Sequence, residues 1–305
     1  MGVALGGYVL AATVEAGVIR WLQPTEWEVV SVSDLALATA LGAAVYLWRH
    51  LLTTRLALAQ RERAEIVLQT QLSLAAEIQR QLLPPLPPAT DGFEWAALLR
   101  PAGKIGGDFY DFVETAPGTW VVLIADVSGK GIPAAMALGS LRSTFRALAS
   151  QQLAPAQIVA QLSTTFLHDW QGMPYVTCIV AALNAQARTV VYSNAGHPPG
   201  VLFGPIGTRH LTCGGPPAGL IAGATYDQEA LNVHAQDTCV LLSDGVTEAL
   251  AGLPLEDISR ALRDHTAMDL CNTLMSAALA GPGPTGDGDW DDDRTAVVVK
   301  VRDHK

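Results

Sequence analysis

The sequence predicts an α+β layered domain that follows an N-terminal helical region. Three observations predict this arrangement. The segment PPLPP at 84–88 divides the chain, short β-like runs separated by glycine follow Phe93, and helical patterns fall between only some of those runs. Because several strands precede each pair of helices, strands and helices do not alternate strictly. An α+β domain therefore fits better than a doubly wound parallel sheet.

The composition is that of a folded chain with a net negative charge. Its 305 residues leave room for roughly two domains, and 50% apolar against 16% charged residues argues against disorder. The net charge of −10 opposes binding of nucleic acid, because neutralising phosphates needs clustered Lys and Arg. The four cysteines form no CxxC pair, so the sequence indicates buried thiols rather than a zinc site or a disulfide framework.

The first 50 residues contain two apolar stretches, 2–19 and 29–48, each close to the roughly 20 residues of a bilayer-spanning helix. Several arginines follow the second stretch, which is typical of a cytoplasmic flank. We therefore predict a two-helix membrane hairpin, with the remaining chain in the cytoplasm. A signal peptide would need a basic start that the first stretch lacks. Glu15 and Asp34 leave a non-embedded alternative open, because a charge inside a bilayer costs at least about 2.5 kcal/mol.

Residues 51–83 are predicted to form one continuous helix, which contains no Gly or Pro and ends at the proline segment. A 4-3-7 spacing joins four of its apolar residues, Leu68, Leu72, Ala75 and Leu82. The position that this spacing skips is Gln79. Two interpretations follow: a coiled-coil seam between two copies, with Gln79 as a polar register residue, or a helix packed on the next domain. In either case the helix links the membrane end to the rest of the chain.

The remaining elements are predicted from apolar runs and helical periodicity. Six runs are predicted as strands, at residues 93–99, 119–126, 176–183, 188–194, 237–244 and 295–301. Helices are predicted near residues 133–150, 155–170, 256–265 and 268–280. The stretch GPGPTGDGDWDDD at residues 281–293 is predicted as a flexible acidic loop that leads into the last strand.

Four aspartates lie in glycine-containing motifs next to predicted strands: Asp108 in GGDFYD, Asp126 in ADVSGKG, Asp244 in SDGVTE and Asp292 in DDDRT. Any one of them could simply be a turn residue, because Asp and Gly favour turns. Several converging carboxylates would instead repel each other unless a cation compensates their charge. Oxygen ligands without a His or Cys cluster suit Mg²⁺ or Mn²⁺ rather than Zn²⁺. Two such ions about 4 Å apart would activate a water for displacement at phosphorus.

An ordered set of six motifs resembles the metal-dependent protein phosphatase (PPM) family, in its bacterial SpoIIE/RsbU-type branch: AAEIQRQLLPP, GGDFYD, DVSGKGIPAAM, NAGHPP, SDGVTEA and DDRT. The resemblance begins near residue 75 and extends to the C-terminus. It implies an α-β-β-α sandwich, two central β-sheets flanked by helices, with two bound Mn²⁺ or Mg²⁺ ions. It also implies hydrolysis of phosphoserine or phosphothreonine on a partner protein, typically a phosphorylated anti-anti-sigma factor of the STAS fold.

The resemblance also implies roles for individual residues. Asp126 matches the carboxylate that bridges both ions, and the backbone carbonyl of Val127 completes one coordination sphere. Asp244 and Asp292 match the ligands that complete the other sphere. Asp108 matches an acidic residue that acts on the second ion, often through water, so Asp108 and Asp126 are the expected catalytic carboxylates.

Other positions near these motifs could also contribute to the site. The register in DDDRT is ambiguous by one residue, so Asp293 or Asp291 could replace Asp292 as the ligand. Gly106 and Gly107 would let the backbone pass close to the metal centre. His197 in NAGHPP could protonate the leaving serine oxygen or orient the phosphate, since its ordinary pKa is in the useful range. Alternatively, His197 could be a structural residue that fixes the turn between two strands.

We expect three parts: a two-helix membrane anchor at 1–50, a regulatory linker helix at 51–83 and the phosphatase domain at 84–305. The anchor and linker could form a homodimer and shift the helix that follows Asp126, which would complete or spoil the metal site. The leading interpretation is a membrane-anchored serine/threonine phosphatase in bacterial stress or sigma-factor signalling. Two alternatives remain: a catalytically degenerate module that only binds its partner, and a two-metal hydrolase of small phosphoesters.

Overall fold

The computed structural model describes residues 32–88, 92–129, 131–171, 173–251, 265–280 and 292–302. The chain divides into two compact units, residues 1–70 and 71–305. The predicted apolar stretch 2–19 lies outside the described residues. So do nearly all of the predicted helix at 256–265 and all but the last two residues of the predicted loop at 281–293.

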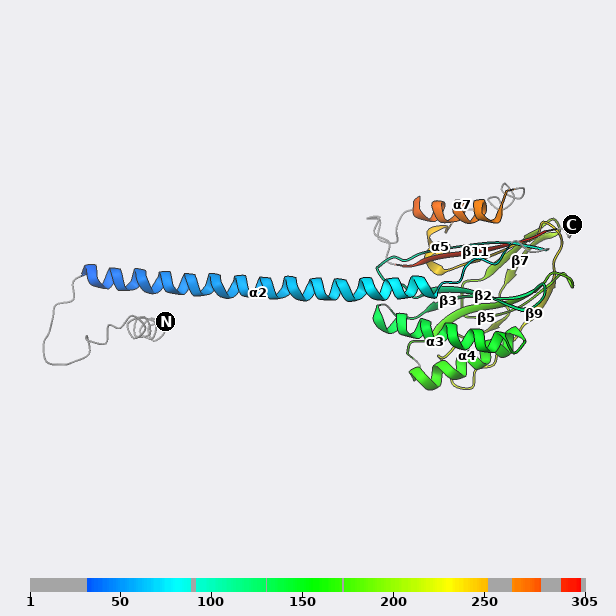
Figure 1. Cartoon of the computed structure of the whole chain (residues 1–305), viewed down its shortest axis with the longest axis horizontal. Coiled ribbons are helices and arrows are strands. Elements are labelled where there is room, and N and C mark those ends of the chain that lie inside the picture. Colours follow the sequence, from blue (N-terminus) through cyan, green and yellow to red (C-terminus); the bar gives the residue numbers. More distant parts are fainter. Residues whose placement is uncertain are drawn as a thin grey trace. The chain divides into compact units, whose positions relative to one another are not determined.

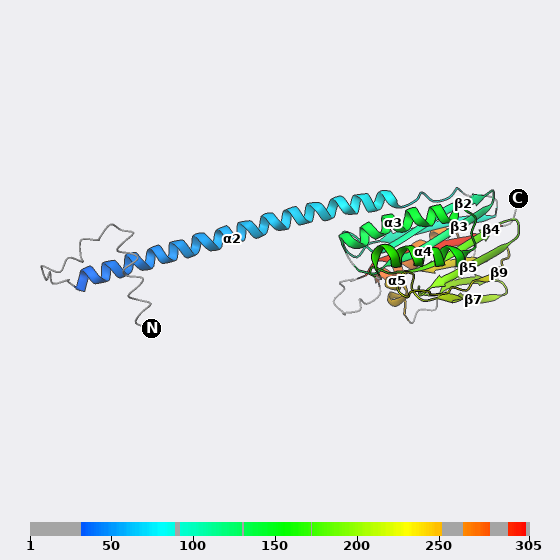
Figure 2. The same ribbon diagram turned by 90° about the horizontal axis from the view of Figure 1, so that it is seen from below.

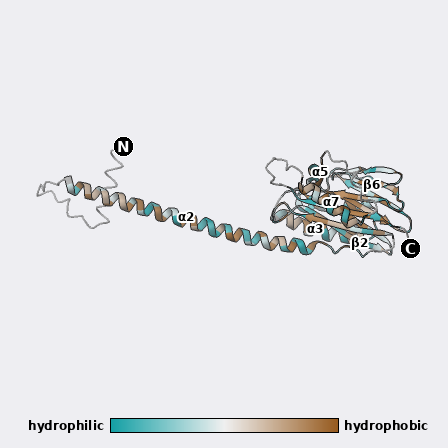
Figure 3. Ribbon diagram, turned by 90° about the horizontal axis from the view of Figure 1, so that it is seen from above, coloured by the Kyte–Doolittle hydropathy of each residue, from teal (hydrophilic) through white to brown (hydrophobic). Residues whose placement is uncertain are grey.

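Helix α2 (Val32–Leu82) is a single 51-residue helix, so the second apolar stretch continues without a break into the predicted linker helix. Within the described residues, α2 is the one helix that is long and apolar enough to cross a membrane, judged by length and composition. Hydrophobic positions recur along it (Figure 3), and Leu37 and Trp48 are 63% and 64% exposed. An apolar helix whose large side chains are exposed is stabilised by lipid or by another helix around it.

The second unit contains two β-sheets. The five-stranded sheet has the order β1 (Phe93–Arg100), β11 (Arg294–Val301), β10 (Thr238–Leu242), β6 (Gly200–Gly204), β7 (Gly207–Leu211). The six-stranded sheet has the order β2 (Asp108–Ala116), β3 (Thr119–Val127), β4 (Val176–Asn184), β5 (Thr189–Ala195), β8 (Gly214–Gly215), and β9 (Glu229–Asn232) also pairs with β5. All pairings within these sheets are antiparallel except β5 with β8.

The sheets and helices form four layers, as the resemblance implied. The sheets face each other across a core that includes Ile124 of β3 and Val297 of β11. Helices α3 (Ile132–Ala149) and α4 (Pro155–Trp170) cover the outer face of the six-stranded sheet through a second core that includes Leu123. Helices α5 (Asp244–Ala249) and α7 (Ala267–Ala280) cover the other sheet. Figure 1 shows α7 and the α3–α4 pair on opposite sides of the two sheets, and Figure 2 shows α3 and α4 lying across the six-stranded sheet.

The six predicted strands are confirmed as β1, β3, β4, β5, β10 and β11, but β2 and the short strands β6 to β9 were not predicted. Strand β2 has the sequence DFYDFVETA, whose apolar alternation is interrupted by Asp111. Asp111 is fully buried on the helix-covered face of the sheet, where its carboxylate accepts hydrogen bonds from Arg146 of α3 at 2.6 and 2.7 Å. A buried carboxylate, paired with a partly exposed arginine, thus occupies a position where the pattern requires an apolar side chain.

The last turns of α2 belong to the second unit. Leu82 and Leu83 pack against the core beneath α3 and α4, and the Gln79 side chain is only 6% exposed. The face that carries Gln79 is therefore packed on the chain's own domain. This favours the second interpretation of the 4-3-7 spacing at this end of the helix.

Candidate metal centre

One end of the sandwich brings together the ends of four strands. Strand β2 begins at Asp108, and β3 ends one residue after Asp126. Strand β10 ends two residues before Asp244, and β11 begins two residues after Asp292. Because β2 pairs antiparallel with β3 and β10 with β11, the start of one strand lies beside the end of its partner. The four predicted aspartates therefore gather from both sheets.

Asp108 and Asp126 face the space between the sheets. They are direct register partners on β2 and β3, so their side chains project from the same face. That face also carries Tyr110 and Ile124, which belong to the core between the sheets. The hydroxyl of Thr295 on β11 donates a 2.6 Å hydrogen bond to Oδ2 of Asp108, which joins the two sheets directly at this site. Thr295 was not predicted as a site residue, although it lies within the DDRT motif.

Burial and neighbouring carboxylates raise the pKa of three aspartates in this cluster. Burial, followed by Asp244, Asp292 and Asp293, raises the pKa of Asp126 to about 7. Burial and then Asp126 raise the pKa of Asp108 well above its usual range. For Asp244, burial and then Asp292 also raise the pKa. Aspartate pKa values that are raised by burial and by neighbouring carboxylates indicate a place where negative charge accumulates. A divalent cation would be stabilised there.

The donor chemistry of the cluster fits hard divalent ions, because it offers carboxylates and a backbone carbonyl. In the described part of the chain, no three acidic, His or Cys side chains are already arranged to hold one ion. Carboxylates that lack a compensating cation repel each other, and an Asp side chain can turn about two bonds. Ion binding at this end of the sandwich would therefore require these side chains to turn toward one another.

Gly106 and Gly107 bring the backbone against this cluster. A Cβ at Gly107 would lie 2.5 Å from the carbonyl oxygen of Val127 and 2.6 Å from Oδ1 of Asp126. A Cβ at Gly106 would collide with the carboxylate of Asp293. The two glycines are therefore required for close packing rather than for an unusual backbone angle.

Asp292 and Asp293 have different surroundings. Asp293 is 7% exposed, and its carboxylate accepts hydrogen bonds from the backbone N–H groups of Ala102 (2.8 Å), Gly107 (2.5 Å) and Asp108 (3.4 Å). Asp292 is exposed and acts electrostatically on both Asp126 and Asp244. Both oxygens of Asp293 are already engaged in holding the loop, which favours Asp292 as the ligand. Asp291 lies outside the described residues.

His197 lies in the turn between β5 and β6, and its environment differs from that expected of an acid. Its backbone N–H donates to Oδ1 of Asn194 (2.8 Å), and Nδ2 of Asn194 donates to its carbonyl (3.0 Å). The imidazole is 4% exposed, with Nδ1 2.9 Å from the Thr177 hydroxyl. Burial lowers the pKa of His197 to about 3, so the ring is neutral near pH 7. This placement favours the structural alternative over the proposed proton donor.

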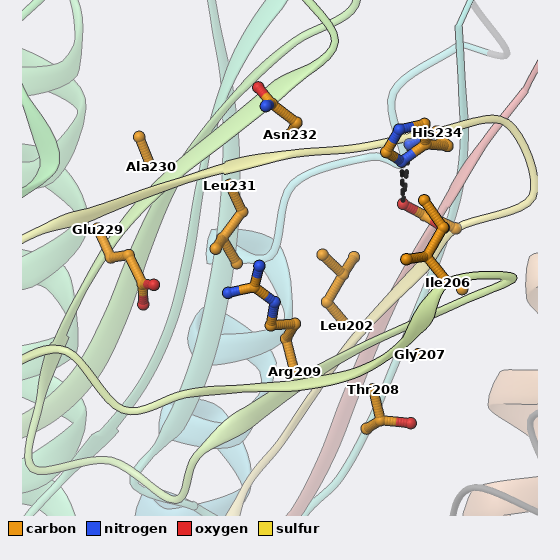
Figure 4. A pocket seen from close by; sticks show the side chains of 12 residues that line it. Leu202, Ile206, Gly207, Thr208, Arg209, Glu229, Ala230, Leu231, Asn232 and His234 are labelled. Atoms are coloured by element: carbon orange, nitrogen blue, oxygen red, sulfur yellow. Dashed lines mark hydrogen bonds and ion pairs between the residues drawn. The ribbon is translucent and has the colours of Figure 1, made fainter.

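A separate cavity of about 380 Å³ lies beside the β6–β7 hairpin and β9 (Figure 4). Its lining includes Arg209, Glu229 and His234, and Nδ1 of His234 is 3.6 Å from Oδ2 of Asp237. Asp237 immediately precedes β10, whereas Asp244 follows the other end of that strand. The cavity is thus remote from the aspartate cluster and contains none of the predicted ligands.

Comparisons with known proteins agree with this architecture. The profile of the family described as "Stage II sporulation protein E (SpoIIE)" matches residues 116–302, which include Asp126, Asp244 and Asp292 but not Asp108. Phosphoserine phosphatase RsbU of Bacillus subtilis is 26% identical over 243 residues, which cover 76% of this chain and 70% of RsbU. Phosphoserine phosphatase RsbP of the same organism is 26% identical over 212 residues, and the match spans 68% of this chain but only 52% of RsbP.

Solved structures show the same fold. The RsbU and RsbW domains of a Mycobacterium tuberculosis protein match with a TM-score of 0.62 and 21% identity, covering 74% of this chain and 64% of that one. The SiaA PP2C domain of Pseudomonas aeruginosa also matches with a TM-score of 0.62, at 17% identity, covering 78% of this chain and 98% of that domain. The four-layer sandwich, the matched family profile and the aspartates at its strand ends lead to one conclusion: this chain belongs to the SpoIIE family of PPM-type, PP2C-like phosphatases.

Proposed function

We propose that this chain is a metal-dependent protein serine/threonine phosphatase that acts on a phosphorylated STAS-domain anti-anti-sigma factor. The observation that carries the proposal is the convergence of Asp108, Asp126, Asp244 and Asp292, from both sheets, at one end of the sandwich. The relatives RsbU and RsbP are both named phosphoserine phosphatases, which supports hydrolysis of a phosphorylated serine as the reaction of this chain.

The residues that would hold two Mn²⁺ or Mg²⁺ ions are Asp126 with the carbonyl of Val127, then Asp244 and Asp292, with Asp108 acting on the second ion. When bound, such ions supply Lewis-acid stabilisation of the phosphoryl oxygens and a water of lowered pKa. The chain's own residues orient this chemistry. Thr295 donates to Oδ2 of Asp108 and so fixes the orientation of this carboxylate, and Asp293 fixes the loop that carries Asp108. His197 has no role in proton transfer in this proposal.

The exposure of the cluster supports a protein substrate. Asp126 and Asp244 are half-buried and Asp292 is exposed, so the centre opens at the end of the sandwich. A phosphorylated side chain on a protein surface could reach such a site. A hydrolase of small phosphoesters usually surrounds its ligand in a concave pocket, and the cavity beside β9 lies elsewhere. A degenerate module that only binds its partner would not need four converging carboxylates.

The N-terminal part of the chain supports attachment to the bacterial cytoplasmic membrane, with the phosphatase domain in the cytoplasm. Its apolar segment in α2 has exposed side chains, and basic residues follow it. In this proposal residues 1–50 anchor the chain, 51–83 link it and 84–305 catalyse the reaction. Ile66 and Leu74 are both 64% exposed on α2, which is compatible with pairing of two copies along this helix.

The test is phosphate release by the full chain in detergent micelles from a phosphoserine STAS-domain protein, compared with p-nitrophenyl phosphate. We expect release from the phosphoprotein that requires Mn²⁺, stops with chelator and is lost in Asp126→Asn. The matched control is Asp227→Asn, another aspartate outside the cluster, which should retain activity. Hydrolysis of p-nitrophenyl phosphate without any release from the phosphoprotein would favour the small-substrate alternative. Tight binding of the phosphoprotein without hydrolysis would favour the degenerate module.

A further inference from the structure

The cavity beside the β6–β7 hairpin opens between edge strands of the two sheets. Its volume is about 380 Å³, and β7 and β9 supply most of its lining (Figure 4). Among the described strands, β7 pairs only with β6 and β9 only with β5, so each has a free edge. Pockets of roughly 300 to 1,000 Å³ hold small molecules in proteins. The cavity is therefore large enough for a small ligand.

Arg209 and Glu229 point into this cavity from different sheets. Arg209 is the register partner of Leu202, which belongs to the core between the sheets. Glu229 is the register partner of Tyr192, whose ring lies in the same core. Residues that are paired directly project from the same face of a sheet. A guanidinium and a carboxylate therefore extend into the space between the sheets at its open edge.

The Glu229 carboxylate is oriented by the core, and the Arg209 guanidinium has no protein partner. Oε2 of Glu229 accepts a 2.5 Å hydrogen bond from the hydroxyl of Tyr192, a fully buried residue. That hydroxyl accepts a 3.3 Å hydrogen bond from the backbone N–H of Cys213. Within the described residues, no hydrogen bond or ion pair involves the Arg209 side chain. The cavity thus presents a positive and a negative group that do not pair with each other.

The opposite end of the cavity compensates its own charges. Figure 4 shows Ile206 and His234 at that end, away from Glu229. Oδ2 of Asp237 accepts a 2.8 Å hydrogen bond from the backbone N–H of His234 and lies 3.6 Å from Nδ1 of the same residue. Leu202 and Leu231, each 5% exposed, add an apolar surface to the lining. A complementary ligand therefore carries a negative charge, a positive charge and an apolar group.

We propose that this cavity binds a small zwitterion with an apolar side group, of the chemical class of an α-amino acid such as leucine. The ligand carboxylate accepts two parallel hydrogen bonds from the Arg209 guanidinium. The ligand ammonium donates to the Glu229 carboxylate, and the side group packs on Leu202 and Leu231. Glu229 repels a ligand that carries only negative charge, and Arg209 repels a simple amine. This inference goes beyond the proposed phosphatase activity and does not depend on it.

The test is calorimetric titration of the full chain in detergent micelles with L-leucine and with three analogues that each lack one group. Glycine lacks the side group, 4-methylpentanoate lacks the ammonium and 3-methylbutylamine lacks the carboxylate. We expect a dissociation constant on the order of 0.1 mM for L-leucine and at least about tenfold weaker binding of each analogue. Binding should be unchanged by chelator and in Asp126→Asn, because the aspartate cluster is no part of this site.

Two variants and a matched control locate the binding. Arg209→Gln removes the cation, and Glu229→Gln removes the negative charge but keeps an acceptor for Tyr192. Each should weaken L-leucine binding at least about tenfold. His210→Gln is the control and should match the wild type, because His210 is exposed on β7 and pairs with Val201, which faces away from the space between the sheets. If Glu229→Gln does not fold, Arg209→Gln alone gives the comparison.

Three results would overturn the proposal. The first is no saturable binding of L-leucine up to about 10 mM. The second is equally tight binding of 4-methylpentanoate, which would show a site for carboxylates alone. The third is wild-type affinity in Arg209→Gln. Phosphate release from the phosphoprotein is measured separately on the same preparations, so failure of the proposed function is distinguishable from failure of this inference.

Discussion

Asp292 and Asp293 are adjacent carboxylates, and the structure predicts opposite consequences of removing them. Asp293 accepts two short hydrogen bonds, from Ala102 at 2.8 Å and from Gly107 at 2.5 Å, and a longer one from Asp108. Hydrogen bonds to a charged group contribute about 1.5 to 3 kcal/mol each, and the N–H groups left behind are buried. The cost of burying the Asp293 carboxylate and its repulsion of Asp126 offset part of the stabilisation that these hydrogen bonds provide. We expect Asp293→Ala to lower the free energy of unfolding by about 3 kcal/mol.

Asp292 contributes little to the stability of the metal-free protein. Its carboxylate accepts one 3.0 Å hydrogen bond from the Asp293 N–H and repels Asp126 and Asp244. These effects oppose each other, so Asp292→Ala should change the free energy of unfolding by less than about 1 kcal/mol. It should instead abolish or strongly weaken binding of one Mn²⁺ ion. Asp293→Ala, measured under conditions where it remains folded, should retain both ions with reduced affinity.

The assay is urea unfolding of the metal-free full chain, together with Mn²⁺ titration of the same preparations. The matched pair differs only in which neighbouring carboxylate is removed, so differences in expression or detergent cancel. The reasoning is refuted if Asp292→Ala destabilises the protein by several kcal/mol and leaves two Mn²⁺ ions bound. It is equally refuted if Asp293→Ala retains full stability.

Three further predictions concern the same end of the sandwich. The pKa of Asp126 is raised to about 7 when folded but is near 4 when unfolded, so the metal-free protein should lose stability, by about 4 kcal/mol, as pH rises from about 4 to 7. Urea unfolding at several pH values checks this, and Asp126→Asn should flatten the dependence. Thr295→Val should weaken Mn²⁺ binding about fivefold by freeing Asp108, whereas Thr295→Ser should keep near-normal affinity, as calorimetry would reveal. His197→Ala should cost about 2 kcal/mol of stability without altering the shape of the pH–rate profile; loss of an inflection from that profile would restore a catalytic role.

The sequence was sufficient for the elements whose burial follows a simple pattern. The apolar runs that became β3, β10 and β11 are buried on both faces, and glycine or aspartate marks their ends. The aspartates could be placed in one site because each borders such a strand. Strand β2 was not predicted because Asp111 interrupts its apolar alternation. Asp111 pairs with Arg146, which lies 35 residues away in the sequence, and a local pattern cannot reveal such a partner.

Side-chain roles that depend on tertiary contacts could not be predicted in the same way. The family motif favours Asp292 over Asp293 without giving a physical reason, and the N–H groups of Ala102 and Gly107 supply that reason by engaging Asp293. Gln79 was visible as a gap in an apolar spacing, but its partner Gly106 lies across the fold. The sequence left His197 open between a role in catalysis and a structural role, and its burial favours the structural one. In each case the chemistry of the residue is set by neighbours that are distant in the chain.

The most direct test of the central claim is the number of Mn²⁺ ions that the full chain binds at its aspartate cluster. Calorimetric titration should give two ions per chain for the wild type. Asp126→Asn, which alters the carboxylate proposed to bridge both ions, should bind neither ion tightly, whereas Asp227→Asn should still bind two. Unchanged binding of two ions by Asp126→Asn, or no binding by the wild type, would contradict the assignment of this end of the sandwich as a two-metal centre.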